Sequence, residues 1–92
     1  MIKPFIIIKS EKKLTKVFLD DILYCKAEGS YTQIVSKNLV ATSCKVLKLI
    51  SCELEGYNFF RINRSYLINF DNCIEIKKNK RPIIVFSNKT EL

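Results

Sequence analysis

The segment Phe59–Phe70, FFRINRSYLINF, has the residue types of a buried strand except at its centre, where Arg61–Ser65 is RINRS. Arginine offers a planar fork of N–H donors that fits phosphates and guanine edges, and asparagine and serine can hydrogen-bond to either group. A guanidinium between two apolar runs also needs a partner for its charge, so an ion pair from Arg64 to Glu28 or Glu53 is a competing interpretation. The pattern therefore indicates either a turn that binds a ligand or a structural ion pair.

Three further turns between apolar segments contain polar or basic residues. They are EGSY (Glu28–Tyr31), KKNKR (Lys77–Arg81) and SNKT (Ser87–Thr90). Binding residues tend to lie on loops that a rigid scaffold holds, so these turns and Arg61–Ser65 form the candidate binding surface. For Lys77–Arg81 a simpler interpretation, in which the charge only keeps an exposed hairpin soluble, is favoured for at least two of the four charges.

Catalytic chemistry has little support in the sequence. The chain has no histidine, which excludes a catalytic triad or a histidine base, and its two glycines are too far apart for a phosphate-binding loop. The carboxylates of Asp20, Asp21, Glu53 and Glu55 lie at a turn or at a helix end, where solvated roles are expected. We therefore predict that the protein is not an enzyme and uses no cofactor.

The four cysteines lack the spacing of a metal site. Cys25, Cys44, Cys52 and Cys73 form no CxxC pair, and without histidine a Cys/His zinc site is excluded. Three of them lie next to aliphatic or aromatic residues. Buried free thiols in a reducing cytosol are therefore predicted, and a redox switch has less support because nothing marks one thiol as exposed and acidic.

Net charge narrows the class of partner. Lysine and arginine number 16 against nine aspartates and glutamates, which gives a charge of +7. This excess favours nucleic acid or an anionic membrane surface, although a merely solvated surface explains the charge equally well. The N-terminal MIKPFIIIKS has too short an apolar run for a secretory signal, and no stretch approaches the roughly 20 apolar residues of a membrane span. A cytoplasmic location without a membrane partner is expected.

Short apolar segments rich in β-branched and aromatic residues dominate the chain, and its 92 residues are enough for one domain. Polar turns separate the segments, and Gly29 is expected to take the positive φ of a tight turn. The predicted strands are 5–9, 16–19, 21–28, 31–37, 39–43, 59–62, 66–70, 73–77 and 82–87.

One segment has helical spacing. Between Ser43 and Gly56 the apolar residues are spaced as on one face of a helix, and they are Val46, Leu47, Ile50 and Leu54. Ser43 is placed to cap the start of this helix and Gly56 to end it. The predicted fold class is therefore all-β with one short helix.

The order of these elements and the segment Phe60–Asn69, FRINRSYLIN, resemble the LytTR DNA-binding domain, the all-β output module of many bacterial response regulators. The family pattern has phenylalanine, arginine, an aliphatic, usually histidine, arginine or lysine, serine, an aromatic, two aliphatics and asparagine. Residues 20–34, DDILYCKAEGSYTQI, match the family's spacing of aspartate, isoleucine, tyrosine and alanine or glutamate, and 47–54, LKLISCEL, match its single helix. The resemblance covers nearly the whole chain.

The resemblance implies small antiparallel sheets of the LytTR type, whose loops reach successive major grooves on one face of double-stranded DNA. By position, the loop at Ser30 and Tyr31 would enter one groove, with Tyr31 where the family often has a base-contacting histidine or tyrosine. Arg64 would meet DNA between the two grooves, with Asn63 and Ser65 on either side of it. Among the other motif residues, the resemblance implies core positions for Phe60, Leu67 and Ile68 and a structural hydrogen-bonding role for Asn69.

Two departures from the family pattern affect these expectations. Asn63 replaces the usual histidine, which keeps hydrogen-bonding capacity but removes a titratable group. The family pattern continues past the final hairpin into a valine-serine-arginine segment whose arginine reads bases, whereas this sequence ends at Leu92, so the C-terminal end of the pattern is expected to be missing. Lys89 lies nearest to that point, and a phosphate contact from it competes with a solvated lysine. No receiver domain is expected within residues 1–92.

Together these features predict a sequence-specific double-stranded DNA-binding domain of a bacterial transcriptional regulator. Promoter repeats are the expected target, and a homodimer on DNA is one expected arrangement. The alternative is a regulatory or protein-interaction domain that keeps the LytTR fold with weak or lost DNA binding. Binding of single-stranded nucleic acid through stacked aromatics has less support, because Phe59, Phe60 and Tyr66 fit core positions better.

Overall fold

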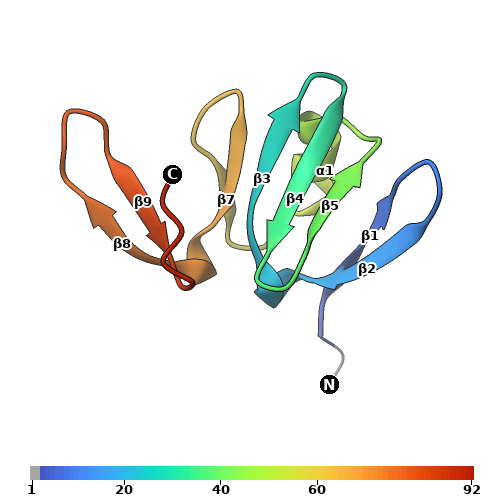
Figure 1. Cartoon of the computed structure of the whole chain (residues 1–92), viewed down its shortest axis with the longest axis horizontal. Helices are drawn as coiled ribbons and strands as arrows, with labels where there is room; N and C mark the ends of the chain where they lie inside the picture. The colour runs from blue at the N-terminus through green and yellow to red at the C-terminus, as the bar shows by residue number, and fades with distance from the viewer. Residues whose placement is uncertain (1–2) are drawn as a thin grey trace.

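Nine strands, one α-helix and two short 3-10 helices follow one another along the described part of the chain (Figure 1). The computed structural model describes residues 3–92, so the first two residues of the N-terminal segment lie outside it. The elements are β1 (Phe5–Lys9), β2 (Leu14–Phe18), η1 (Leu19–Asp21), β3 (Ile22–Glu28), β4 (Tyr31–Ser36), β5 (Val40–Ser43), α1 (Leu47–Glu53), β6 (Phe59–Arg61), β7 (Tyr66–Asn69), η2 (Phe70–Asn72), β8 (Cys73–Lys77) and β9 (Ile83–Phe86).

The strands form three antiparallel sheets. A central five-stranded sheet has the order β5-β4-β3-β7-β6, and β1–β2 and β8–β9 are separate two-stranded sheets. Figure 1 shows the central sheet between these two hairpins along the long axis of the molecule. The predicted fold class, all-β with one short helix and small antiparallel sheets, is therefore confirmed.

Both faces of the central sheet are covered, because side chains alternate between the faces along each strand. On β7, Leu67 packs into a core shared with α1 and the β1–β2 hairpin, whereas Ile68 packs into a second core with Ile84 and Phe86 of β9. The core positions predicted for Leu67 and Ile68 are thus confirmed. The two cores hold the outer hairpins against the sheet.

The predicted strands are all present, with boundaries that differ by at most two residues. Gly29 has a φ of 61°, as expected for a glycine in the tight turn between β3 and β4. The helix is shorter than its apolar spacing predicts, because it begins at Leu47 and ends at Glu53. No helix within residues 3–92 has the length and apolar content that crossing a membrane requires.

The predicted cap of the helix is wrong. Ser43 is the last residue of β5 and pairs with Thr32, and its Oγ accepts a hydrogen bond from the Lys45 N–H at 3.1 Å. The residue that precedes the helix is Val46, which offers no side-chain cap. Gly56 lies two residues beyond the C-cap and has a φ of 91°, consistent with the role predicted for it near the helix end.

The core position predicted for Phe60 is also wrong. Phe60 lies on β6, the outer strand of the central sheet, and its side chain is 53% exposed. Its ring packs edge-on against Phe70 with 5.1 Å between the ring centroids. The neighbouring Phe59 points to the other face and packs against the larger core, whereas Tyr66 is half-buried against Tyr24.

Only one of the four cysteines is buried as predicted. Cys25 lies in the core, and burial raises the pKa of its thiol to about 12. Cys44 and Cys52 are exposed, because Cys44 follows the end of β5 and Cys52 lies on the outer side of α1, and Cys73 is half-buried. All four are free thiols.

Asn69 has the structural role that the resemblance implies. Its side-chain amide donates hydrogen bonds to the carbonyl oxygens of Leu19 at 3.1 Å and Ile22 at 2.8 Å, and it is almost fully buried. Asn72 donates to the Asp20 carbonyl at 2.8 Å and to the Ile22 carbonyl at 2.7 Å. These two asparagines fix η2 and β7 to the start of β3.

Candidate nucleic-acid interface

Four hairpin turns lie along one edge of the molecule (Figure 1). Because successive strands alternate in direction, the turns that follow β1, β3, β6 and β8 leave the sheets at the same end. We call this edge the turn edge, and it consists of residues 10–13, 29–30, 62–65 and 78–82. Helices η1 and η2 and the turns at 37–39 and 87–90 lie at the opposite edge.

The two central turns and the first residue of β4 contain five of the six predicted site residues. Strand β7 pairs with β3, and the Ala27 N–H donates to the Ser65 carbonyl at 2.7 Å, which joins the β6–β7 turn to the end of β3. The structure therefore brings Ser30 and Tyr31 to the same part of the turn edge as 63–65. The two groups of residues are more than 30 positions apart in the sequence, and the pairing of β3 with β7 brings them together.

Two side chains hold the β6–β7 turn in shape. Asn63 Oδ1 accepts hydrogen bonds from the backbone N–H groups of Ser65 at 2.8 Å and Tyr66 at 3.0 Å. Arg61 Nη2 donates to the Arg64 carbonyl at 2.8 Å. Asn63 thus keeps only its amide N–H groups for a ligand. Sequence reasoning gave Arg61 no role, and its spacing of three residues from Arg64 across the turn was the available signal.

The guanidinium of Arg64 makes no ion pair among the described residues, and the residue is exposed. The two acids proposed as its competing partners are engaged elsewhere, since Glu28 pairs with Lys26 at 3.2 Å and Glu53 pairs with Lys45. The hydrogen bond and charge of Glu28 raise the pKa of Lys26. The ion-pair interpretation of Arg64 is therefore wrong, and its charge is available to a ligand.

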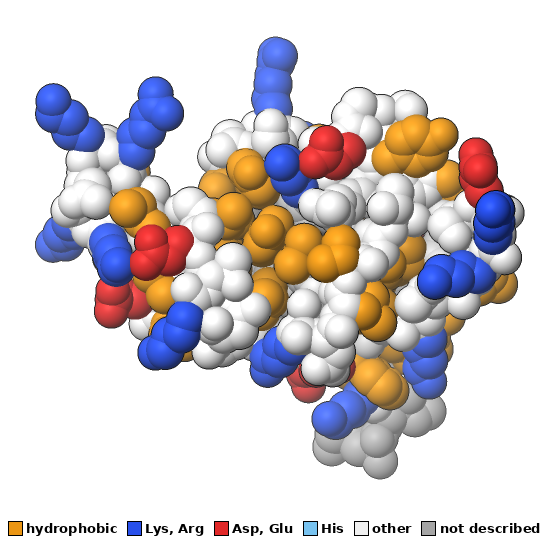
Figure 2. All heavy atoms as spheres, viewed as in Figure 1, with side chains coloured by type: hydrophobic (Ala, Val, Ile, Leu, Met, Phe, Trp, Pro, Cys, Tyr) orange, Lys and Arg blue, Asp and Glu red, His pale blue; other side chains and the backbone are white. Residues whose placement is uncertain are grey.

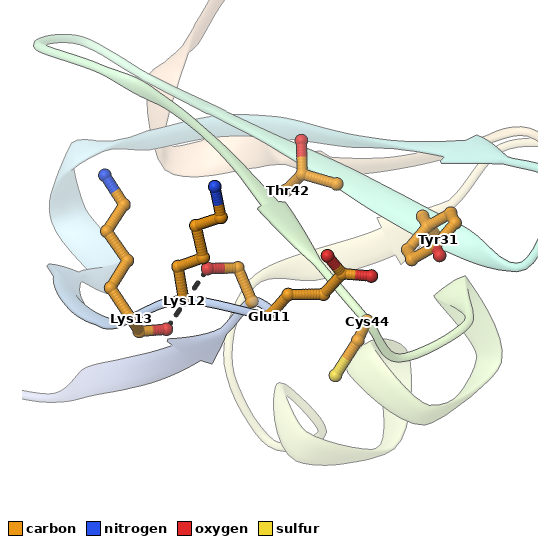
Figure 3. A pocket seen from close by; sticks show the side chains of 7 residues that line it. Glu11, Lys12, Lys13, Tyr31, Thr42 and Cys44 are labelled. Atoms are coloured by element: carbon orange, nitrogen blue, oxygen red, sulfur yellow. Dashed lines mark hydrogen bonds between the residues drawn. The ribbon is translucent and has the colours of Figure 1, made fainter.

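Tyr31 stands at the rim of a pocket between the central sheet and the β1–β2 turn (Figure 3). The pocket has a volume of about 450 Å³ and is lined by Ser10, Glu11, Lys12, Lys13, Tyr31, Thr42 and Cys44. In Figure 3 the Glu11 side chain extends from the turn toward β5, whereas Lys12 and Lys13 point away from it. The lining therefore combines one carboxylate with two ammonium groups, and Tyr31 is an exposed residue at its edge.

Lys89 is not near the other predicted site residues. It lies in the 87–90 turn, at the opposite edge, where Ser87 N–H donates to the Asn72 carbonyl at 2.8 Å. Lys89 has a φ of 72°, and its N–H donates to the Phe86 carbonyl at 2.8 Å. A straight duplex along the turn edge would not pass this residue.

The β8–β9 turn places three cations at one end of the turn edge. Lys77, on the last position of β8, pairs with Glu91 at 2.8 Å, and the hydrogen bond and charge of this acid raise the pKa of Lys77. Lys78, Lys80 and Arg81 are exposed and make no ion pair among the described residues. Figure 2 shows lysine and arginine side chains projecting from this hairpin tip.

The described residues were also compared with the requirements of a metal site. Within residues 3–92 no three acidic, cysteine or histidine side chains come together as a metal site. The turn edge combines exposed cations with hydroxyl and amide groups on rigid hairpins. Such a surface suits phosphates and base edges.

A comparison with protein families identifies the domain. The model of the LytTR DNA-binding domain matches residues 12–92. The chain belongs to the LytTR family. The match includes both central turns and the β8–β9 turn, whereas β1 lies outside it. The protein is therefore a DNA-binding domain by family.

A solved LytTR structure has the same fold. The LytTR DNA-binding domain of a Bacillus cereus protein described as a methyl-accepting/DNA response regulator matches with a TM-score of 0.81 and 18% sequence identity. The match covers 98% of this chain and 84% of that one. Among curated protein sequences, no match is found.

Proposed function

We propose that this LytTR domain binds double-stranded DNA sequence-specifically as the output domain of a bacterial two-component transcriptional regulator in the cytoplasm. The observation that supports this most is the exposed, unpaired Arg64 on a braced turn beside Ser30 and Tyr31. Two copies are expected to bind side by side on promoter repeats. Lys89, on the opposite edge, is outside the proposed surface.

The dimensions of the turn edge suit a duplex. The molecule is 40 Å long, and the β1–β2 and β8–β9 turns lie near the two ends of this axis. One turn of B-DNA is about 34 Å, so a duplex that runs along the edge would present two successive major grooves to it. The central turns would then reach into the duplex, and the outer turns would lie over its backbone.

Each central residue has a distinct role in the proposal. Arg64 would contact phosphate or a groove edge between the major grooves, since its guanidinium is unpaired. Tyr31 and Ser30 would present hydroxyl groups to base edges in one major groove. Asn63 and Arg61 would mainly keep the β6–β7 turn in its binding shape, because their polar atoms already bond its backbone.

Replacement of Arg64 tests the proposal. A duplex selected from a genomic DNA pool would be titrated with wild type, Arg64→Ala and the control Lys37→Ala, which removes one exposed cation from the opposite edge. We expect Arg64→Ala to weaken binding at least about tenfold, because a hydrogen-bonded charge pair contributes roughly 1.5–3 kcal/mol. Lys37→Ala should bind nearly as wild type does, and both variants should unfold at the wild-type temperature.

Two outcomes would contradict the proposal. If Arg64→Ala bound the selected duplex as tightly as Lys37→Ala, Arg64 would not be a contact. If the folded wild type bound no duplex at any salt concentration, the alternative of a LytTR-fold protein-interaction domain would replace the DNA-binding function. A single-stranded competitor in the same titration excludes binding through unpaired bases.

A further inference from the structure

The β8–β9 turn provides a second contact region for DNA. We propose that Lys78, Lys80 and Arg81, which we call the basic tip, bind backbone phosphates of the same duplex, outside the grooves that the central turns reach. This inference rests on the proposed function, since it requires a duplex along the turn edge. It assigns a contact to a turn for which the sequence alone favours solubility as the role of at least two of the four charges.

The charges of the basic tip are free for a ligand. Among residues 3–92, Glu91 is the only acid that pairs with a lysine of this hairpin, and its partner is Lys77, the residue that precedes the tip. The tip itself contains no acidic residue, and Asn79 adds further N–H donors. By contrast, the β1–β2 turn at the other end of the edge combines Lys12 and Lys13 with Glu11.

The hairpin that presents the basic tip is firmly held. Phe86 of β9 is fully buried and packs against Tyr24 of the central sheet with 5.4 Å between ring centroids. The backbone of Ile84 exchanges two hydrogen bonds with Leu92, at 3.0 and 2.9 Å. Because the hairpin is already fixed at its base, its backbone loses little conformational entropy when the tip binds a ligand. The entropic cost of binding through these cations is therefore small.

The position of the basic tip fits a duplex that the central turns have bound. The tip lies on the turn edge at one end of the 40 Å axis, beyond the β6–β7 turn (Figures 1 and 2). A duplex carries about one negative charge per 1.7 Å of its axis, so phosphates pass any point along the edge. Three cations at this point would meet backbone and not base edges if the central turns occupy the grooves.

Two triple variants with the same net charge distinguish phosphate contacts of the basic tip from a role in solubility alone. The tip variant is Lys78→Gln/Lys80→Gln/Arg81→Gln. The control is Lys3→Gln/Lys37→Gln/Lys89→Gln, which removes three exposed lysines from the opposite edge. Each changes the net charge from +7 to +4 (7 − 3 = 4). Solubility depends on the total charge, whereas phosphate contacts depend on its position.

The measurement is the salt dependence of binding to the selected duplex and to a random duplex. Each lost phosphate contact reduces the slope of log affinity against log salt by about 0.9. We expect the tip variant to lose roughly two to three units of slope on both duplexes, with the ratio of the two affinities unchanged. The control should lose less than about one unit.

Equal slopes for the tip variant and the control would overturn the inference, as would a loss confined to the selected duplex, which would mean base reading. Arg64→Ala in the same assay separates the two proposals: if it weakens binding while the tip variant matches the control, only the basic tip is refuted. If wild type binds no duplex, both proposals fail. The charge-retaining variant Lys78→Arg/Lys80→Arg/Arg81→Lys should keep the wild-type slope. A slope reduced to that of the tip variant would also refute the inference.

Discussion

At the scale of single residues, some side chains of the RINRS segment stabilise the β6–β7 turn, and another is exposed for contact with a ligand. Arg61 and Asn63 form hydrogen bonds with the backbone of their own turn, whereas the Arg64 guanidinium makes no ion pair within the described part of the chain. The family resemblance places both Asn63 and Arg64 at DNA. The hydrogen bonds favour a different assignment, in which Asn63 positions the turn and Arg64 makes the contact.

Two substitutions of Asn63 test its positioning role. Asn63→Ala removes the acceptor of two backbone N–H groups and should cost about 1 kcal/mol of stability and also weaken DNA binding. Asn63→Asp keeps an acceptor at the same place, so its stability should stay within about 0.5 kcal/mol of wild type, while its negative charge repels phosphate. Urea denaturation and duplex titration measure both effects. Full DNA affinity in Asn63→Ala would contradict the positioning role.

Asn69 is expected to act on stability alone. Asn69→Ala removes one of the two donors to each of the buried carbonyl oxygens of Leu19 and Ile22, which should cost about 2–3 kcal/mol. Asn79→Ala, at the exposed β8–β9 tip, is the matched control and should change stability by less than about 0.5 kcal/mol. Equal urea midpoints for the two variants would show that the Asn69 bonds contribute nothing net.

At the scale of elements, local patterns predict the strands well because turns are punctuated by glycine, proline and asparagine and apolar residues alternate between them. These local patterns do not predict which turns lie close together in the folded protein. The contact between Ala27 and Ser65 depends on pairing of β3 with β7, and Lys89 lies on the far edge because β9 runs back from the turn edge. Five of six predicted site residues share a surface for this non-local reason.

Errors in the predicted core and cap have similar causes. Ser43 resembles a helix cap in sequence, but its pairing in β5 commits it to the following turn. Phe60 belongs to the apolar positions of the family pattern, yet it lies on an outer strand and its side chain is 53% exposed. Neither the neighbour of a strand nor its place in a sheet can be derived from local periodicity.

Adjacent phenylalanines on β6 provide a test at this scale. Phe59→Ala opens a cavity beside the larger core and should cost about 3 kcal/mol. Phe60→Ala removes an exposed ring and its contact with Phe70, so about 1 kcal/mol is expected. Denaturant unfolding of the two variants measures the difference. A cost for Phe60→Ala as large as that for Phe59→Ala would restore the core position that the family resemblance implies.

At the scale of the whole molecule, antiparallel hairpins convert a dispersed set of turns into one surface. Basic residues lie in separate turns of the sequence, and the fold brings the exposed cations of the β6–β7 and β8–β9 turns to the same edge. The molecule is 40 Å long, which exceeds one turn of B-DNA, about 34 Å. A LytTR domain with this shape can therefore contact a duplex at several points without moving its core.

The most direct test of this account is an amide ¹⁵N–¹H spectrum titrated with the selected duplex, because it reports on the backbone amides of all four turns at once. We predict that the largest shifts fall on the amides of residues 29–31, 62–65 and 78–81, while the turns at 37–39 and 87–90 are unaffected. Shifts concentrated on the opposite edge, or none in the presence of saturating duplex, would contradict DNA binding along the turn edge.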